Sequence, residues 1–264
     1  MKIERKEWDS EFFGREFYQL EIEKELDPSL IRERLKKLDD EDVFGTECKI
    51  NIRNLEAIPQ LEDLGFRLVD SRMEFITHTV RGQHEIKAPV GEFRRYEHND
   101  WDNLAEITVE NFVDNPNFKS RYTNRQIFSR DESLRYYLQW HKWVIDVSPD
   151  LFLSWIDGDK FVGFYSILRV PDPENRRPRY KVGLAAIHPD YRSHNGQNLM
   201  QAWLFRETND SEWTTINSPQ LTNTSGLKNN IRSGKDLKTV ELFFFRRNPK
   251  GVPRDTNLGH PGGA

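Results

Sequence analysis

Two aromatic-rich apolar runs that flank Asp157-Gly158 are the strongest structural signal in the chain. They make up the segment DLFLSWIDGDKFVGFYSILRV, residues 150–170. An Asp-Gly pair between two alternating apolar runs is typical of a tight hairpin, because glycine accepts the positive φ that such turns require. The sequence therefore predicts two adjacent antiparallel strands, and any fold of this chain must contain a sheet built around them.

Helix-like and strand-like segments alternate on both sides of this hairpin. Asp27-Pro28-Ser29 is a start signal before the helical spacing of Leu30–Leu38, and Gly65 is the expected stop of a second helix. Asn99 or Asp100 is expected to cap a third helix. Further segments with strand or helix patterns are FYQLEIE, CKINI, YKVGLAAIH, EWTTINS and TVELFFFRR (strands) and residues 131–143 and TSGLKNNIRSG (helices). This alternation predicts an α/β protein.

The polar stretch from Val80 to Gly91 divides the chain. It contains glycine and proline, which is typical of a linker. We expect an N-terminal unit at 1–80, a linker at 81–91, a second domain at 92–247 and a mobile tail at 248–264. The segments LGFRLVDSRMEF and SGKDLKTVELFF share a helix end, a glycine and a strand, which indicates either an internal duplication or a common turn.

Composition excludes several classes of function. The net charge of −4, from 39 basic and 43 acidic residues, lacks the basic excess that nucleic-acid binding needs. Cys48 is the only cysteine, so the chain forms no internal disulfide and no cysteine-based zinc site, and we expect no metal. The charged N-terminus and the lack of a run of about 20 apolar residues predict a cytoplasmic protein without a membrane partner.

The stretch AAIHPDYRSHNGQNLMQAWL, residues 185–204, combines a strand, a polar loop and the start of a helix. Main-chain N–H groups at a helix N-terminus, with the helix dipole and a nearby Arg192, form a site for an anion such as phosphate. Such loops usually rely on glycine, and only Gly196 is present here. The alternative is a solvated strand–helix turn that binds nothing.

The run Ile187-His188-Pro189-Asp190-Tyr191-Arg192 resembles motif A of the GNAT superfamily of N-acetyltransferases. The hairpin lies where that family has its second and third strands, and Asn223 with Gly226 and Gly234 is similar to a later family motif. The likeness covers residues 92–246. The segments WDSEFFG, LEDLGFRLVD, FKSRY and YYLQW resemble the dTDP-fucosamine acetyltransferase group, whose members acetylate a 4-amino sugar nucleotide.

The resemblance implies a GNAT fold, with a mixed central sheet and flanking helices, preceded by a smaller truncated GNAT-like unit. It implies acetyl-CoA, or another acyl-CoA, as the acyl donor. The strands at GLAAI and WTTIN would diverge, and the 193–198 amides would face one pocket. The residues implied to bind CoA are Ala185, Ala186 and Ile187 (pantetheine), Ser193, His194, Asn195, Gly196, Gln197 and Asn198 (pyrophosphate), and Arg192 and Asn223.

Two departures from the family pattern affect this expectation. The family's loop glycines fall on Asn195 and Gln197. Asparagine accepts a left-handed backbone better than most residues, so Asn195-Gly196 is able to turn tightly. The Gln197 side chain either crowds the phosphates or hydrogen-bonds to them.

The implied reaction is attack of a neutral amine on the thioester, with a base for the amine proton and an acid for the leaving thiolate. The family's acidic tyrosine corresponds to Asn230, whose amide donates a hydrogen bond but no proton. Tyr180, Tyr191 and Tyr165 are substitutes, or else packed aromatics. His188 has the titration range of a base, and a water chain is the alternative, because the strand KVGLAAIH carries no carboxylate.

Arg121, Tyr122 and Trp140 are the candidates for binding the acceptor. An arginine grips phosphate and an aromatic ring stacks on a base, as a nucleotide sugar requires. The alternative is that Arg121 pairs with an acidic neighbour and Trp140 packs between helices.

The expected function is therefore transfer of an acetyl or short acyl group to a primary amine, most simply of an amino sugar or amino sugar nucleotide. The alternative is a non-catalytic GNAT-fold protein that binds CoA or a related ligand without turnover. An O-acyltransferase would need a stronger base than the sequence offers. The expected partners are a small-molecule amine and, in a homodimer, a second copy of the chain.

Overall fold

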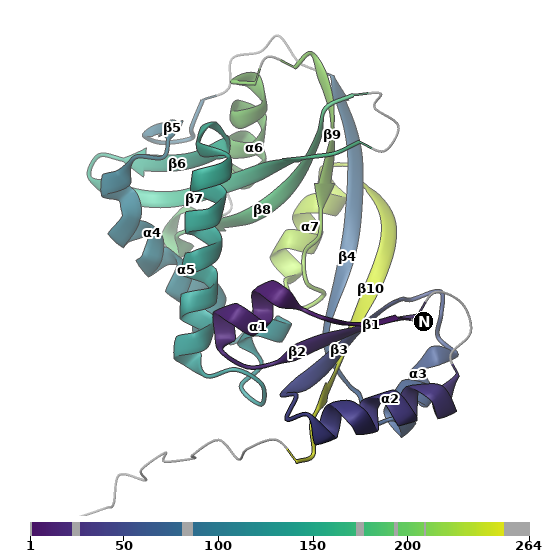
Figure 1. Ribbon diagram of the computed structural model, residues 1–264. Coiled ribbons are helices and arrows are strands. Elements are labelled where there is room, and N and C mark those ends of the chain that lie inside the picture. Colours follow the sequence, from purple (N-terminus) through teal and green to yellow (C-terminus); the bar gives the residue numbers. More distant parts are fainter. Residues whose placement is uncertain are drawn as a thin grey trace, which may run out of the picture. The chain divides into compact units, whose positions relative to one another are not determined.

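The computed structural model describes residues 2–22, 27–80, 87–172, 177–192, 195–208 and 210–250 (Figure 1). Its contacts divide the chain into two compact units, one made of Met1–Val69 and Leu242–Ala264 and the other of Asp70–Glu241. These units differ from the expected boundaries, because the long strands β4 (Arg67–Val80) and β10 (Asp236–Arg247) each run from one unit into the other. Residues 81–86 of the expected linker and 251–264 of the expected tail lie outside the described residues.

In its described residues, the first unit contains three strands and three helices before β4. They are β1 (Lys2–Arg5), α1 (Glu7–Phe13), β2 (Phe17–Glu21), α2 (Pro28–Asp40), β3 (Gly45–Asn51) and α3 (Ala57–Asp63). β1 pairs antiparallel with β2, and β2 pairs parallel with β3. The predicted cap of α2 is confirmed, since the Asp27 carboxylate accepts from the N–H groups of Ser29 at 3.0 Å and Leu30 at 3.1 Å.

Apolar faces of α2 and α3 form the core of the first unit. The buried residues at its centre are Leu20, Ile31, Leu35, Cys48, Leu61, Phe66 and Phe244. Beside this core, the Arg246 guanidinium binds both carboxylate oxygens of Asp39, at 2.7 and 2.6 Å. The two side chains are only 14% and 12% exposed, so the pair is shielded from water.

Among the described residues, the second unit contains five more strands and their connecting helices. They are β5 (Glu92–Arg95), η1 (His98–Asp100), α4 (Trp101–Thr108), η2 (Val109–Val113), η3 (Arg121–Thr123), α5 (Arg130–Val147), η4 (Pro149–Leu151), β6 (Phe152–Asp157), β7 (Lys160–Val170), β8 (Arg179–Ile187), η5 (Pro189–Tyr191), α6 (Gly196–Arg206), β9 (Glu212–Asn217) and α7 (Thr224–Arg232). The strand order is β10-β4-β9-β8-β7-β6-β5. β8 and β9 are parallel, whereas β5 to β8 are joined by antiparallel pairs, as is β4 with β9.

The predicted hairpin is present as β6 and β7. Asp157 pairs with Lys160, and Gly158 adopts a φ of 58° in the turn between them. The strands are buried almost throughout, and their side chains alternate between two helical layers. α4 and α5 pack on the layer that includes Phe164, and α6 packs on the layer that includes Trp155 (Figure 1). The sheet of the second unit is thus covered by helices on both faces.

No helix in the described residues is both long enough and apolar enough to cross a bilayer.

Candidate functional site

The parallel strands β8 and β9 diverge within the second unit. They pair only from Arg179 to Lys181, opposite Thr214 to Ile216. β8 continues unpaired on this side from Val182 to Ile187. Four residues of this stretch are partly exposed although the strand lies inside the sheet: Gly183, Leu184, Ala185 and Ile187. The predicted divergence of GLAAI from WTTIN is confirmed, and it leaves a main-chain edge that water reaches.

The main chain of β8 presents two of its three predicted pantetheine-binding residues at this edge. The N–H of His188 donates to the Val162 carbonyl of β7 at 2.7 Å. Successive residues of a strand direct their N–H and C=O groups to opposite sides. The polar groups of Ala185 and Ile187 therefore point away from β7, toward the open edge, whereas those of Ala186 point toward β7.

The loop before α6 turns at Asn195. This residue has a φ of 55°, the left-handed conformation that the sequence predicts an asparagine to accept. Its carbonyl accepts from the N–H groups of Asn198 and Leu199, both at 3.1 Å. In the described part of the chain, the N–H groups of Gly196 and Gln197 have no acceptor. Two main-chain donors at the positive end of α6 thus lack an acceptor among the described residues; Gly196 is buried and Gln197 is partly exposed. Ser193 and His194 lie outside the described residues.

Gly196 is required by packing. A Cβ atom at this position would lie 2.4 Å from the Trp155 ring and 3.1 Å from Cδ1 of Ile187. The absence of a side chain lets α6 begin directly against β6 and β8. Gln197, the next residue, is partly exposed.

Arg192 connects the end of β8 to η2, a π-helical turn that continues α4. Its guanidinium donates to the Ile187 carbonyl at 3.2 Å and to Oδ1 of Asn111 at 2.7 Å. Asn111 in turn donates to the Ile107 carbonyl at 2.8 Å. Turns of this type recur at functional sites, because the extra residue redirects a side chain. Here that side chain is Asn111, which the sequence did not single out.

Asn223 caps α7. Its Oδ1 accepts from the N–H of Gly226 at 2.9 Å. A Cβ at Gly226 would lie 2.9 Å from the Asn223 amide nitrogen, so the small residue of the motif is explained by the cap. Asn230, one turn further on, is completely buried. Its amide accepts from Asn217 of β9 at 2.9 Å and donates to the Gly226 carbonyl at 2.7 Å, which ties α7 to β9.

The other two predicted catalytic residues lie at opposite ends of β8. The His188 side chain is 43% exposed, with Nδ1 3.7 Å from an Asp190 carboxylate oxygen. Tyr180 lies at the paired end, where its hydroxyl donates to Asp210 and accepts from Arg169 at 2.8 Å. Burial, followed by the hydrogen bond to the Asp210 carboxylate, raises the pKa of Tyr180. Eight residue steps at about 3.3 Å each separate the two positions, so the structure does not bring them together.

Two of the acceptor-binding candidates lie in η3 and contact each other. The Arg121 guanidinium lies 4.6 Å from the Tyr122 ring centre and donates to its hydroxyl at 3.1 Å. Tyr122 stacks on Tyr136 of α5, with ring centres 3.7 Å apart. Trp140, further along α5, packs against Trp143, and its buried indole N–H has no acceptor among the described residues.

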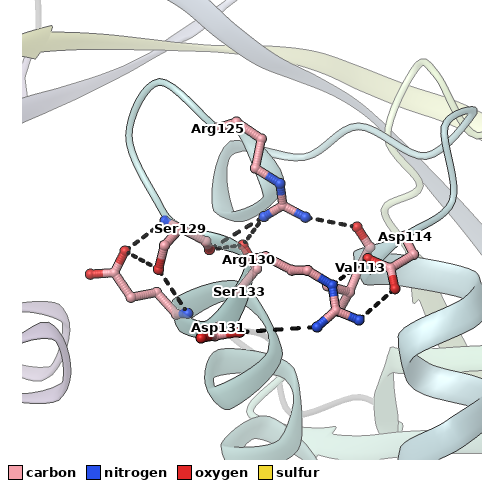
Figure 2. Close-up of polar contacts among 8 residues, drawn as sticks. Val113, Asp114, Arg125, Ser129, Arg130, Asp131 and Ser133 are labelled. Carbon is pink, nitrogen blue, oxygen red and sulfur yellow. Dashed lines mark hydrogen bonds and ion pairs between the residues drawn. The ribbon is translucent and has the colours of Figure 1, made fainter. Parts of the chain in front are cut away.

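Contacts at the start of α5 clamp the loop that carries η3 (Figure 2). Arg125 donates to Ser133 of α5 at 2.8 Å and to the carbonyl of Val113, the last residue of η2, at 3.0 Å. Arg130 binds both carboxylate oxygens of Asp114, at 2.8 and 2.6 Å (Figure 2). The loop is therefore fastened where it leaves η2 and where it enters α5.

Two buried ionisable residues near these elements were missed by the sequence analysis. Asp70 of β4 accepts from the N–H groups of Ser71 at 2.7 Å and Arg121 at 3.2 Å, and burial raises its pKa to about 6. Lys235, after α7, donates to Gln201 at 3.0 Å, and burial lowers its pKa to about 8. Each is a single charged residue in an ordinary strand or turn pattern, so no local signal marked it. Among the described residues, no group of three or more His, Cys, Asp or Glu is placed to hold a metal ion.

The chain is similar to several solved structures. A tandem GNAT protein from the clavulanic acid biosynthesis pathway, solved without AcCoA, is 10% identical with a TM-score of 0.52, covering 86% of this chain and 70% of that one. A functionally unknown protein from Staphylococcus epidermidis is 11% identical with a TM-score of 0.52, covering 89% and 84%. A GCN5-related N-acetyltransferase from Sphaerobacter thermophilus is 16% identical with a TM-score of 0.47, and the match covers 85% of this chain but only 66% of that protein.

No protein-family model and no curated protein sequence matches the chain. The chain has the GNAT fold, as the sequence predicts, and the tandem GNAT neighbour agrees with a two-unit arrangement. At these identities the likeness shows the fold alone, and the likeness to the dTDP-fucosamine acetyltransferase group stays a prediction.

Proposed function

We propose that this chain is an acyl-CoA-dependent N-acyltransferase of the GNAT superfamily, which transfers an acetyl or short acyl group to a primary amine. The observation that carries the proposal is the unpaired edge of β8, together with the N–H groups at the start of α6 that lack an acceptor among the described residues. A main-chain edge and a helix N-terminus next to each other suit an extended ligand with amide groups at one end and phosphates at the other.

In this proposal the CoA pyrophosphate accepts from the N–H groups of Gly196 and Gln197, as well as from the adjoining loop. The helix dipole adds to these hydrogen bonds, and no side chain is needed. The pantetheine amides pair with the main chain of Ala185 and Ile187. Arg192 holds the Ile187 carbonyl in place, and Asn223 fixes the start of α7.

The reaction forms a C–N bond and breaks a C–S bond. The neutral amine attacks the thioester carbon, the amine loses a proton to a base, and the electron pair of the broken bond goes to sulfur. His188 is the proposed base, since it is the one predicted catalytic side chain that is substantially exposed. Tyr180 and Asn230 are both buried and hydrogen-bonded, which favours structural roles for them.

We further propose that the amine belongs to an amino sugar or an amino sugar nucleotide. Arg121 and Tyr122 support this, because they place a cation beside an aromatic ring, both partly exposed, on a loop that is fastened at both ends. Trp140 is the third candidate, with an indole N–H that lacks an acceptor in the described residues.

A binding protein without turnover is the second candidate. It is favoured by Asn230, whose buried amide stands where the family has an acidic tyrosine, and by the absence of a carboxylate on β8. Both candidates require CoA binding, and only the first requires an acylated product.

Calorimetric titration with acetyl-CoA tests the shared requirement. Mass spectrometry after incubation with acetyl-CoA and a panel of amino sugars and their nucleotides then separates the candidates. Binding with an acetylated amine supports the enzyme, and binding without any product supports the second candidate. Absence of binding rejects both.

A further inference from the structure

Lys235 is a buried lysine between α7 and α6. It follows Gly234, whose φ of 67° ends α7, and its N–H donates to the Asn230 carbonyl at 3.1 Å. The residue is only 9% exposed, and Nζ donates to Oε1 of Gln201 on α6 at 3.0 Å. Lysines are rarely buried without a carboxylate partner, because the ammonium loses hydration that a neutral acceptor replaces only in part.

Gln201, the hydrogen-bond partner of Lys235, places this lysine over the unpaired part of β8. Oε1 of Gln201 also accepts from the Tyr165 hydroxyl at 3.1 Å. Tyr165 of β7 lies directly opposite Ala185 of β8, and both pack in the layer that α6 covers. We call Lys235, Gln201 and Tyr165 the lysine cluster. It lies on the α6 side of the sheet, next to the main-chain edge assigned above to the acyl-CoA.

The surroundings of the ammonium hold no compensating charge. α6 contributes the neutral Gln201, which accepts from Nζ, and β7 contributes the neutral Tyr165, which donates to the same Gln201 oxygen. In the part of the chain that the structure describes, no carboxylate lies within ion-pair distance of Nζ, and burial is the one cause of its lowered pKa, about 8. The neighbouring residue Asp236 is exposed.

We propose that Lys235 is the catalytic acid, and that its ammonium gives a proton to the CoA thiolate as the C–S bond breaks. This inference rests on the proposed N-acyltransferase function. It supplies the proton donor that the reaction needs and that the Asn230 amide cannot provide. As the amine nitrogen bonds to the acyl carbon, the electron pair of the C–S bond goes to sulfur. A proton then passes from Nζ to sulfur, which leaves a neutral Lys235 amine, and solvent returns the proton afterwards.

The acidity of the group suits this task. A thiol has an ordinary pKa of about 8.5 and a lysine one of about 10.4. A lysine whose pKa is lowered to about 8 is still mainly protonated at pH 7 and is nearly matched to the thiolate. Gln201 accepts from the ammonium and Tyr165 donates to Gln201, and neither neutralises the lysine, because neither carries a charge at this pH.

The test compares Lys235→Met with Lys228→Met, which removes an exposed lysine from α7. Calorimetry measures acetyl-CoA binding, and a thiol-reactive chromophore measures CoA release, with the accepted amine or water as acceptor. Cys48 does not disturb this assay, because it is buried and its thiol pKa is raised to about 12. We expect Lys235→Met to retain acetyl-CoA affinity within about twofold and to lose about 10²-fold in kcat, while Lys228→Met matches the wild type.

The pH profile gives a readout that a structural role would not move. The wild-type kcat should fall above a pH near 8, and this basic limb should be absent in Lys235→Met. Gln201→Glu places a carboxylate beside the ammonium, which should move the basic limb upward by about one pH unit or more. This second variant decides the matter where Lys235→Met fails to fold.

The outcomes separate the two proposals. Suppose that the wild type turns over. If kcat is then unchanged in Lys235→Met, or if the basic limb does not move in Gln201→Glu, the role of Lys235 is overturned and the N-acyltransferase proposal stands. Absence of acetyl-CoA binding or turnover in the wild type overturns the proposed function, and the role of Lys235 with it.

Discussion

Replacement of Gln197 by proline removes one main-chain N–H donor from the start of α6. It breaks no hydrogen bond among the described residues. The N–H of Gln197 has no acceptor among the described residues, so its loss leaves no internal partner unsatisfied. Proline is tolerated in the first turn of a helix, where N–H groups are unpaired in any case. The substitution thus tests a ligand contact with little effect on the fold.

The size of the effect follows from the charge of the ligand. A hydrogen bond to a charged group contributes about 1.5–3 kcal/mol, which corresponds to a roughly 10- to 150-fold increase in Kd. Calorimetric titration with acetyl-CoA measures this increase. Gln197→Ala is the matched control, because it removes the same side chain but keeps the N–H, and we expect its Kd to stay within about threefold of the wild type.

A shortened ligand isolates the contact. Acetyl-pantetheine lacks the pyrophosphate, so Gln197→Pro and the wild type should bind it equally. Equal acetyl-CoA affinity in the proline and alanine variants would falsify the assignment of the pyrophosphate to this helix end. A parallel loss for acetyl-pantetheine would attribute the effect to a distorted helix instead.

Three further predictions concern stability, measured by urea unfolding. Gly196→Ala should destabilise the protein by about 1–3 kcal/mol, because the added Cβ would lie 2.4 Å from the Trp155 ring; an unchanged midpoint would contradict the packing role. Asp39→Ala should cost about 3 kcal/mol, because it leaves the shielded Arg246 guanidinium without its carboxylate; a cost below about 1 kcal/mol would mean that water replaces the pair. Burial lowers the pKa of His141 to about 3, below its ordinary value of about 6.5. Between these two pH values His141 is protonated in the unfolded chain but neutral in the folded chain, which favours unfolding. Stability should therefore fall by about 1.4 kcal/mol per pH unit from 6.5 toward 3, and His141→Gln should lack this component of the slope.

Local patterns predicted most of the elements around the site. The hairpin follows from Asp157-Gly158, and the end of α7 follows from Gly234, because both glycines adopt the positive φ that those turns require. β1 and α1, a strand of 4 residues and a helix of 7 residues, were missed. The paths of β4 and β10 through two units depend on pairing between distant segments, which no local pattern records.

The candidate site was predicted unevenly for the same reason. Main-chain features such as the divergence of β8 from β9 and the turn at Asn195 followed from the resemblance and from the conformational range of asparagine. Side-chain partnerships did not. Gln201 meets Lys235 across 34 positions of sequence, and the Asp70 carboxylate meets the main-chain N–H of Arg121 across 51. Such contacts arise only after the sheet has formed, so a reading of neighbouring residues assigns those side chains no role.

The packing of Gly196 against Trp155 has a consequence for how loops of this kind are recognised from sequence. Glycine is retained at this position by the bulk of a tryptophan, whether or not a ligand ever enters the loop. At residue 197, by contrast, every amino acid except proline carries the N–H, which has no acceptor among the described residues. Substitutions at residue 197 other than proline therefore keep this main-chain donor. A glycine at residue 196 indicates that α6 packs closely against the sheet, and by itself it does not indicate a bound ligand.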